Sequence, residues 1–267
     1  MKGVLNLDYK TIIYEKDKNG IVTVTFNRPE RLNAINPLMS WEIRESLKEM
    51  SEDKKVKVAI FTGKGRAFSS GMDLKMDITL PEEADVDLGD IAQKGLILEL
   101  FDFEKPTIAA VNGVAMGFGW NFAQACDLVH ASEEATMGYF FVKRALVPEA
   151  GSTYLLPRSV GIHRAKELMF FGDRFDARKA FELGLVNKVL LAEELMPEAK
   201  RTAEKLAKGP SLSLKLIKKM INSHLRDHIS HALDLENDGL YETMSSMDFF
   251  EAIVAFSEKR KPIFRGE

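Results

Sequence analysis

The sequence predicts an α/β fold, because short apolar segments that suit buried strands alternate with segments of helical periodicity. Val58 to Thr62 and Thr107 to Val111 have the apolar composition of buried strands, whereas Pro37 to Met50 repeats its apolar residues at helical spacing. From about residue 193 onward, one helical segment follows another. We therefore expect an α/β core at residues 1–192 and a helical C-terminal region at residues 193–267.

The first strands should form a hairpin. Tyr9 to Lys16 and Ile21 to Phe26 are rich in β-branched and aromatic residues, and the turn-forming pair Asn19-Gly20 separates them. In the C-terminal region, Leu212 to Leu225 is expected to be an amphipathic helix. Its apolar residues share one face, and its lysines lie largely on the other.

Composition excludes several classes of protein. The chain has 267 residues, of which 45% are hydrophobic and 29% charged, as in a soluble globular protein with a sizeable core. A net charge of −3 does not indicate a nucleic-acid partner. No apolar run is long enough for a membrane span or a signal peptide. The single cysteine, Cys126, cannot form an internal disulfide, so we expect a cytoplasmic protein.

Two glycine-rich tracts, at residues 63–74 and 110–121, follow the two buried strands and are the best candidates for a functional site. Glycine permits backbone shapes that expose N–H groups, and a helix that begins near Gly119 would add its own unsatisfied N–H groups. Such donors suit a developing oxyanion. The alternatives are a surface loop for the first tract and a close-packed turn for the second. The first tract is not a P-loop, because no Gly-Lys-Ser/Thr closes it, and the second is not a dinucleotide fingerprint, because Phe122 replaces the third glycine.

Several stretches in a fixed order resemble the enoyl-CoA hydratase/isomerase (crotonase) superfamily over nearly the whole chain. They are Phe26 to Ala34, Ala67 to Leu74, Pro106 to Asp127, Val147 to Thr153, Ala177 to Val189 and Phe256 to Lys261. The resemblance implies an acyl-CoA thioester substrate and a crotonase-like (ClpP/crotonase) ββα spiral. It also implies a C-terminal helical trimerisation region, in a homotrimer or a dimer of trimers. It implies no cofactor or metal beyond the coenzyme A of the substrate.

The same resemblance assigns roles to particular residues. The backbone N–H groups of Met72 and Phe118 correspond to the oxyanion hole that stabilises a thioester enolate. Phe256 and Lys259 correspond to residues that reach the adenine and the 3′-phosphate, often from a neighbouring subunit. The remaining substrate-binding positions are expected at Arg31, Leu32, Ala34, Ala67, Ser70, Asp73, Gly117, Asn121 and Phe141.

The sequence departs from the resemblance where hydratases carry two catalytic glutamates, since Asn121 and Phe141 occupy those positions. Neither side chain can transfer a proton as a carboxylate does. Glu149 is the available carboxylate, at a position where some isomerases of the superfamily carry a single base and dehalogenases a nucleophilic aspartate. We therefore expect isomerase-type proton transfer through Glu149. The alternative for this residue is an N-cap carboxylate on a helix that starts near Gly151.

Other functions stay open. Hydration or acyl-CoA hydrolysis would use the same oxyanion hole. A catalytically inactive module would bind acyl-CoA without catalysing a reaction. An RNA-binding role is disfavoured because the first helix mixes acidic and basic residues. His224, His228 and His231 have the spacing of one helical face, but we expect no metal site because no fourth ligand is evident.

Overall fold

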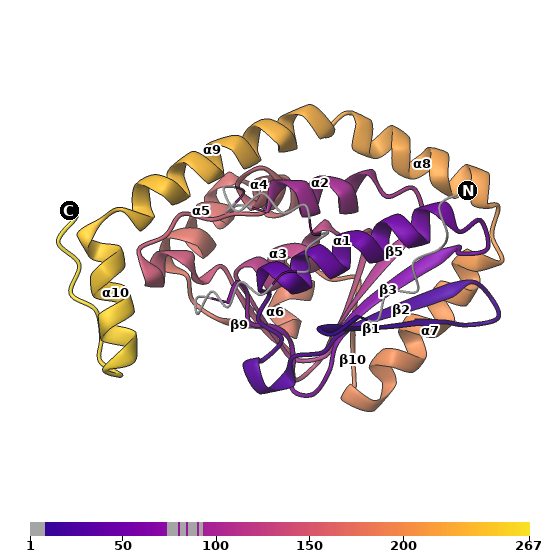
Figure 1. Ribbon diagram of the computed structural model, residues 1–267, viewed down its shortest axis with the longest axis horizontal. Helices are drawn as coiled ribbons and strands as arrows, with labels where there is room; N and C mark the ends of the chain where they lie inside the picture. Colours follow the sequence, from indigo (N-terminus) through magenta and orange to yellow (C-terminus); the bar gives the residue numbers. More distant parts are fainter. Residues whose placement is uncertain (1–8, 74–79, 81–83, 85–89, 91–92) are drawn as a thin grey trace.

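The computed structural model describes residues 9–73, 80, 84, 90 and 93–267 (Figure 1). A six-stranded sheet has the order β1-β2-β3-β5-β7-β10. Its strands are β1 (Ile12–Lys16), β2 (Ile21–Phe26), β3 (Val58–Gly63), β5 (Thr107–Val111), β7 (Leu128–Ser132) and β10 (Lys188–Leu190). β1 and β2 pair antiparallel across the Asn19-Gly20 turn, so the predicted hairpin is confirmed.

A second sheet of four short strands has the order β4-β6-β8-β9. Its strands are β4 (Ala67–Ser69), β6 (Val114–Met116), β8 (Thr136–Gly138) and β9 (Phe175–Asp176). Each of β4, β6 and β8 directly follows a strand of the larger sheet, and the two sheets keep the same strand order. The chain therefore winds as successive ββ units stacked in a spiral.

Ten α-helices lie within the described residues. They are α1 (Pro37–Glu52), α2 (Lys94–Asp102), α3 (Phe118–Ala125), α4 (Ser152–Val160), α5 (Ile162–Phe171), α6 (Ala177–Glu182), α7 (Ala192–Ala207), α8 (Ser211–Ser223), α9 (Arg226–Met244) and α10 (Met247–Ser257). Two 3₁₀ helices, η1 (Pro29–Arg31) and η2 (Phe140–Arg144), complete the set. The α/β class predicted from the sequence is thus confirmed. Of the acidic segment at residues 81–90, only residues 84 and 90 are among the described residues.

Two hydrophobic clusters cover the opposite faces of the six-stranded sheet. The larger cluster joins β1, β2 and β3 to α1, α2 and α3. In the smaller cluster, Leu195, Ala199, Ala203 and Ala207 of α7 pack on apolar side chains of β2, β3 and β5. α7 begins at Ala192, at the expected boundary, and this packing attaches it to the core. The division into two regions stays a prediction.

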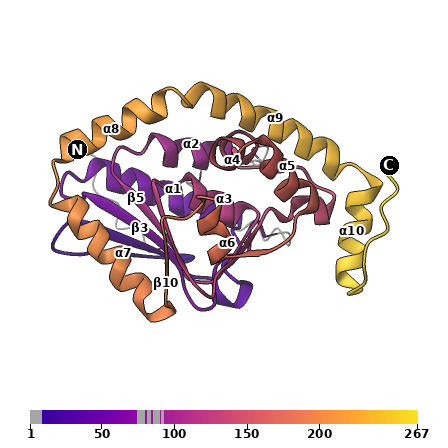
Figure 2. The ribbon, with the colours of Figure 1, turned by 180° about the vertical axis from the view of Figure 1, so that it is seen from behind.

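The C-terminal helices form an arch along one side of the molecule (Figures 1 and 2). α8 and α9 pass over α2 and α4, and α10 hangs from the far end of the arch. α8 has its amphipathic faces in an unexpected orientation. Lys218 points inward to Asp127, 2.8 Å away, whereas the apolar side chains are exposed: Leu216 43%, Ile217 50%, Met220 59% and Ile221 60%.

The described residues contain no helix that combines the length and the apolar character of a membrane span. His224 follows the end of α8, whereas His228 and His231 belong to α9, so the three histidines do not share one helix. In this part of the chain, no three His, Cys, Asp or Glu side chains are grouped as metal ligands would be.

Candidate active site

The first glycine tract brings the Met72 amide beside the start of α3. Gly71 has φ +100°, and its carbonyl accepts a hydrogen bond from the Ile35 amide at 2.8 Å. A Cβ atom added at Gly71 would lie 2.9 Å from the Met116 carbonyl oxygen and 3.5 Å from the Phe118 nitrogen. The backbone segments that carry the Met72 and Phe118 N–H groups are therefore nearly in contact.

α3 begins at Phe118, which places the Phe118 amide among the N–H groups that have no acceptor within the helix. Gly117 precedes it with φ +50°, and Gly119 packs so closely on β4 that an added Cβ would lie 2.4 Å from the Ser69 carbonyl oxygen. In the described residues, neither Met72 nor Phe118 has an acceptor assigned to its amide. Both donors are thus available for an oxyanion.

Phe141 forms an apolar wall of this site. It lies in η2 and is 7% exposed, and its ring would be 3.5 Å from a Cβ atom at Gly117. The ring therefore lies against the residue that precedes the Phe118 donor. A phenyl ring cannot transfer a proton as a carboxylate does.

Glu149 lies on a turn that is attached to α3. The Asn121 side chain, on the first turn of α3, donates from Nδ2 to the Glu149 carbonyl oxygen at 2.9 Å. Asn121 is 1% exposed and Glu149 is 5% exposed. Asn121 therefore connects the helix that carries the Phe118 donor with the turn that carries the carboxylate.

The environment of Glu149 favours its neutral form. Burial, together with the negative charges of Glu236 and Asp90, raises the pKa of Glu149 to about 8. Removing a carboxylate from water penalises its charge, and neighbouring negative charges add to that penalty. Such a carboxyl group exchanges protons near neutral pH, as a general acid–base catalyst must.

The capping role considered for Glu149 belongs to another residue. Gly151 is the N-cap of α4, with no side-chain hydrogen bond of its own, and the amides of Gly151 and Thr153 donate to the carboxylate of Glu236. The N-cap interpretation of Glu149 is therefore wrong.

The two loops expected to line the coenzyme A path lie against each other. The Ser70 amide donates to the Leu32 carbonyl at 3.0 Å, and Ser70 Oγ lies 3.4 Å from the Arg31 carbonyl. Ala34 is 8% exposed. Asn33 Nδ2, which sequence reasoning did not single out, donates at 2.7 Å to the carbonyl of the fully buried Ala67.

Asp73 is held by protein groups on both its backbone and its side chain. Its amide donates to the Ile35 carbonyl at 2.9 Å, and its carboxylate pairs with Arg28 at 2.8 Å. Arg28 also donates to the Ala34 carbonyl at 2.5 Å. The Asp73 side chain thus fastens the loop that carries Met72 to the loop after β2.

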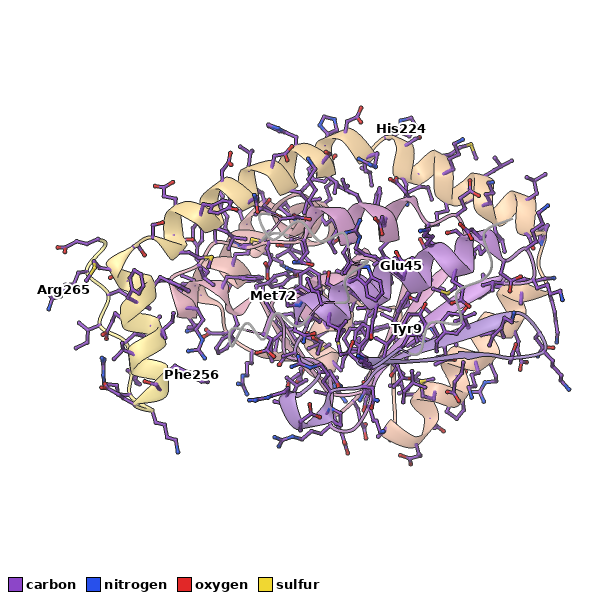
Figure 3. All side chains as sticks on the ribbon, in the orientation of Figure 1. Tyr9, Glu45, Met72, His224, Phe256 and Arg265 are labelled. Atoms are coloured by element: carbon purple, nitrogen blue, oxygen red, sulfur yellow. The ribbon has the colours of Figure 1, made fainter. Side chains whose placement is uncertain are left out.

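Phe256 and Lys259 lie apart from these residues within one chain. Phe256 lies on α10 and is 63% exposed. The Arg144 guanidinium stacks over its ring, 3.9 Å from the ring centre. Figure 3 shows Phe256 at the outer end of the molecule, away from Met72. Lys259 follows α10, with φ +55°. The structure of one chain therefore does not bring the tail to the oxyanion donors.

A family model described as "Enoyl-CoA hydratase/isomerase" matches residues 16–267. The chain belongs to the enoyl-CoA hydratase/isomerase family. Its ββ spiral and C-terminal helices are accordingly those of the crotonase fold. A crystal structure of an enoyl-CoA hydratase/isomerase from Pseudoalteromonas atlantica superposes with a TM-score of 0.87 at 31% identity, covering 96% of this chain and 100% of the other.

The relatives of this family member carry different reaction names. A 1,2-epoxyphenylacetyl-CoA isomerase from Escherichia coli is 38% identical, over 94% of this chain and 97% of its own length. A crotonyl-CoA hydratase from Syntrophomonas wolfei is 35% identical, over 96% of this chain and 98% of its own length. The comparisons therefore establish the family and not the reaction.

Proposed function

We propose that this protein is an enoyl-CoA isomerase-type enzyme that moves a carbon–carbon double bond with a single base, Glu149. One observation carries the proposal. The buried Glu149 carboxyl group lies on a turn that is hydrogen-bonded to α3, the helix that begins at Phe118. The family resemblance supports the proposal as well, since it assigns the positions of the two hydratase glutamates to Asn121 and Phe141. Moving a double bond needs only one base, whereas standard hydration needs two carboxylates to handle a water molecule.

In the proposed reaction, the ionised Glu149 removes a proton from carbon 2 of a 3-enoyl-CoA. The electron pair of that C–H bond moves toward the thioester carbonyl and forms a dienolate. The N–H groups of Met72 and Phe118 stabilise the oxyanion. Glu149 then returns the proton to carbon 4, and the double bond forms between carbons 2 and 3.

A second candidate is hydration, which the 35% identical crotonyl-CoA hydratase favours. The two reactions are separated by supplying the purified protein with a 3-enoyl-CoA and, in parallel, with crotonyl-CoA. We expect the 2-enoyl isomer from the first substrate at a rate well above hydration of the second. Fast hydration without isomerisation would replace the proposal with the hydratase function.

Coenzyme A recognition is proposed to include Lys259, whose ammonium group is suited to the 3′-phosphate. Calorimetric titration should show that the wild type binds coenzyme A more tightly than dephospho-coenzyme A. Lys259→Ala should lose that preference, at a cost of about tenfold in affinity if one ion pair is lost, as expected for a charge-assisted contact. The same preference in both proteins would remove Lys259 from the site.

A homotrimer or a dimer of trimers is proposed from the exposed apolar side chains of the arch. Besides those of α8, they include Leu235 of α9 and Phe250, Ile253 and Val254 of α10. Exposed apolar patches of this kind mark protein interfaces. In such an assembly, the tail with Phe256 and Lys259 would reach the site of a neighbouring subunit.

Static light scattering of the purified protein should give the mass of a trimer or of a hexamer. Leu216→Glu combined with Ile217→Glu should shift that mass toward the monomer, because the charges would be buried without partners. A stable monomer that binds coenzyme A normally would contradict the assembly.

A further inference from the structure

The turn that carries Glu149 has an unfavourable backbone conformation. The two residues after Glu149 both have positive φ angles, +60° at Ala150 and +73° at Gly151. Glycine adopts this region freely, but alanine does so at a cost, because its Cβ atom approaches the backbone. Successive left-handed residues persist only where surrounding groups hold them.

Glu236, on α9, supplies the groups that hold this turn. It is 3% exposed, and its Oε2 accepts the Gly151 amide at 2.7 Å. Its Oε1 accepts the Thr153 amide at 2.8 Å and the Thr153 hydroxyl at 2.6 Å. A carboxylate from a distant part of the sequence thus binds Gly151, in the turn that follows Glu149, and Thr153, in the first turn of α4.

We propose that Glu236 is a positioning residue for Glu149, which fixes the turn that aims the Glu149 carboxyl group and places a buried negative charge beside it. The first role follows from the three hydrogen bonds to Gly151 and Thr153. The second follows from burial, since the charge of Glu236 is screened only weakly from its neighbour. The proposal rests on the function proposed for Glu149.

The geometry favours the negative charge on Glu236, because three hydrogen-bond donors reach its carboxylate. Burial raises the pKa of Glu236, but its three hydrogen-bond donors favour the ionised form and oppose that rise. Asp90 is the other acidic group that acts on Glu149, and its carboxylate accepts the amides of Lys94 and Gly95. Glu236 should therefore ionise first, and its charge then disfavours ionisation of Glu149.

The test measures the titration of Glu149 directly. Infrared spectra of each protein, minus those of its Glu149→Gln counterpart, give the pH midpoint of the Glu149 carboxyl group without any assay of turnover. Glu236→Gln removes the charge and should lower that midpoint by at least about one pH unit, the scale on which a neighbouring charge acts. It should also lower turnover of a 3-enoyl-CoA about tenfold at pH 9, with an unchanged KM.

The chain offers a matched control in Glu42 of α1. Glu42 is 2% exposed and accepts hydrogen bonds from two backbone amides, those of Lys10 and Thr11, and from the Thr11 hydroxyl. Glu42→Gln therefore removes a buried carboxylate with the same kinds of donors, outside the surroundings of Glu149. It should leave both the midpoint and turnover unchanged.

Thr153→Val keeps the Glu236 charge and removes one donor to it. This variant provides the test if Glu236→Gln does not fold. It should lower turnover of a 3-enoyl-CoA about threefold, without lowering the pH midpoint of the Glu149 carboxyl group. Two results would overturn the proposal. One is a Glu149 titration midpoint that is the same in Glu236→Gln as in the wild type, and the other is wild-type turnover in Thr153→Val. Failure of the wild type to isomerise any 3-enoyl-CoA would instead count against the proposed function, because the infrared titration needs no turnover.

Discussion

Glu149→Gln is expected to lower turnover of a 3-enoyl-CoA at least about 100-fold, the lower end of the range for general acid–base catalysis. The substitution keeps the size of the side chain but removes its ability to accept and return a proton. Acyl-CoA affinity should change little, since the Met72 and Phe118 donors are backbone groups of other segments. Steady-state kinetics should therefore show a fall in kcat with a nearly constant KM.

Two controls accompany this result. Asn121→Ala should cost less than about tenfold, because the Asn121 amide cannot transfer a proton and its Nδ2 donates to the Glu149 backbone carbonyl, 2.9 Å away. Thermal melting separates catalysis from folding. Since burial already penalises the Glu149 charge, its replacement should not lower Tm at pH 8. Full activity of Glu149→Gln on the substrate that the wild type uses would refute the assignment.

Removing the Met72 N–H group is expected to lower turnover by about 10²–10³, the usual cost of losing one oxyanion donor. Side-chain substitution cannot test this donor, because it belongs to the backbone. Incorporating the α-hydroxy acid analogue of methionine at residue 72 replaces the amide with an ester. This deletes the donor and leaves the Gly71 carbonyl as a weaker acceptor for the Ile35 amide. The effect should fall on kcat, since the negative charge develops on the thioester oxygen only as the dienolate forms.

The matched control is the same amide-to-ester change at Asp73. The Asp73 amide donates to the Ile35 carbonyl at 2.9 Å, so its loss removes a structural hydrogen bond from the same loop. We expect a loss of less than about tenfold there, because a typical hydrogen bond contributes about 1 kcal/mol. Equal losses at Met72 and Asp73 would mean that the loop, and not the oxyanion donor, was disturbed.

Local patterns in the sequence predicted much of the fold. The Asn19-Gly20 hairpin and the buried strands β3 and β5 are confirmed because each is determined by turn chemistry or by a short apolar run. α8 shows where such patterns fail. The helical periodicity of this segment was predicted correctly. However, Lys218 lies inward against Asp127, whereas the apolar residues of α8 are exposed. Periodicity identifies an apolar face without identifying what covers it.

The candidate site was predictable where the relevant residues are neighbours in the sequence. The glycine tracts indicated exposed N–H groups, and the family resemblance assigned the oxyanion role to the amides of Met72 and Phe118. The structure brings the segments of these two residues together at Gly71, and their role stays a prediction. Glu236 could not be found in this way, since it lies 85 residues from Gly151 and looks like any acidic residue of an amphipathic helix. A buried carboxylate that caps another helix is a tertiary feature, and no local signal marks it.

The most direct test of the single-base account is a crystal structure of Glu149→Gln with a 3-enoyl-CoA bound. The substitution slows turnover while keeping the shape of the site, so the substrate should survive in the crystal. The account predicts that the side chain at residue 149 faces carbons 2 and 4 of the acyl group. It also predicts the thioester oxygen about 2.7–3.1 Å from the Met72 and Phe118 nitrogens. An acyl group whose carbons 2 to 4 face a different carboxylate, or a thioester oxygen away from those amides, would contradict it.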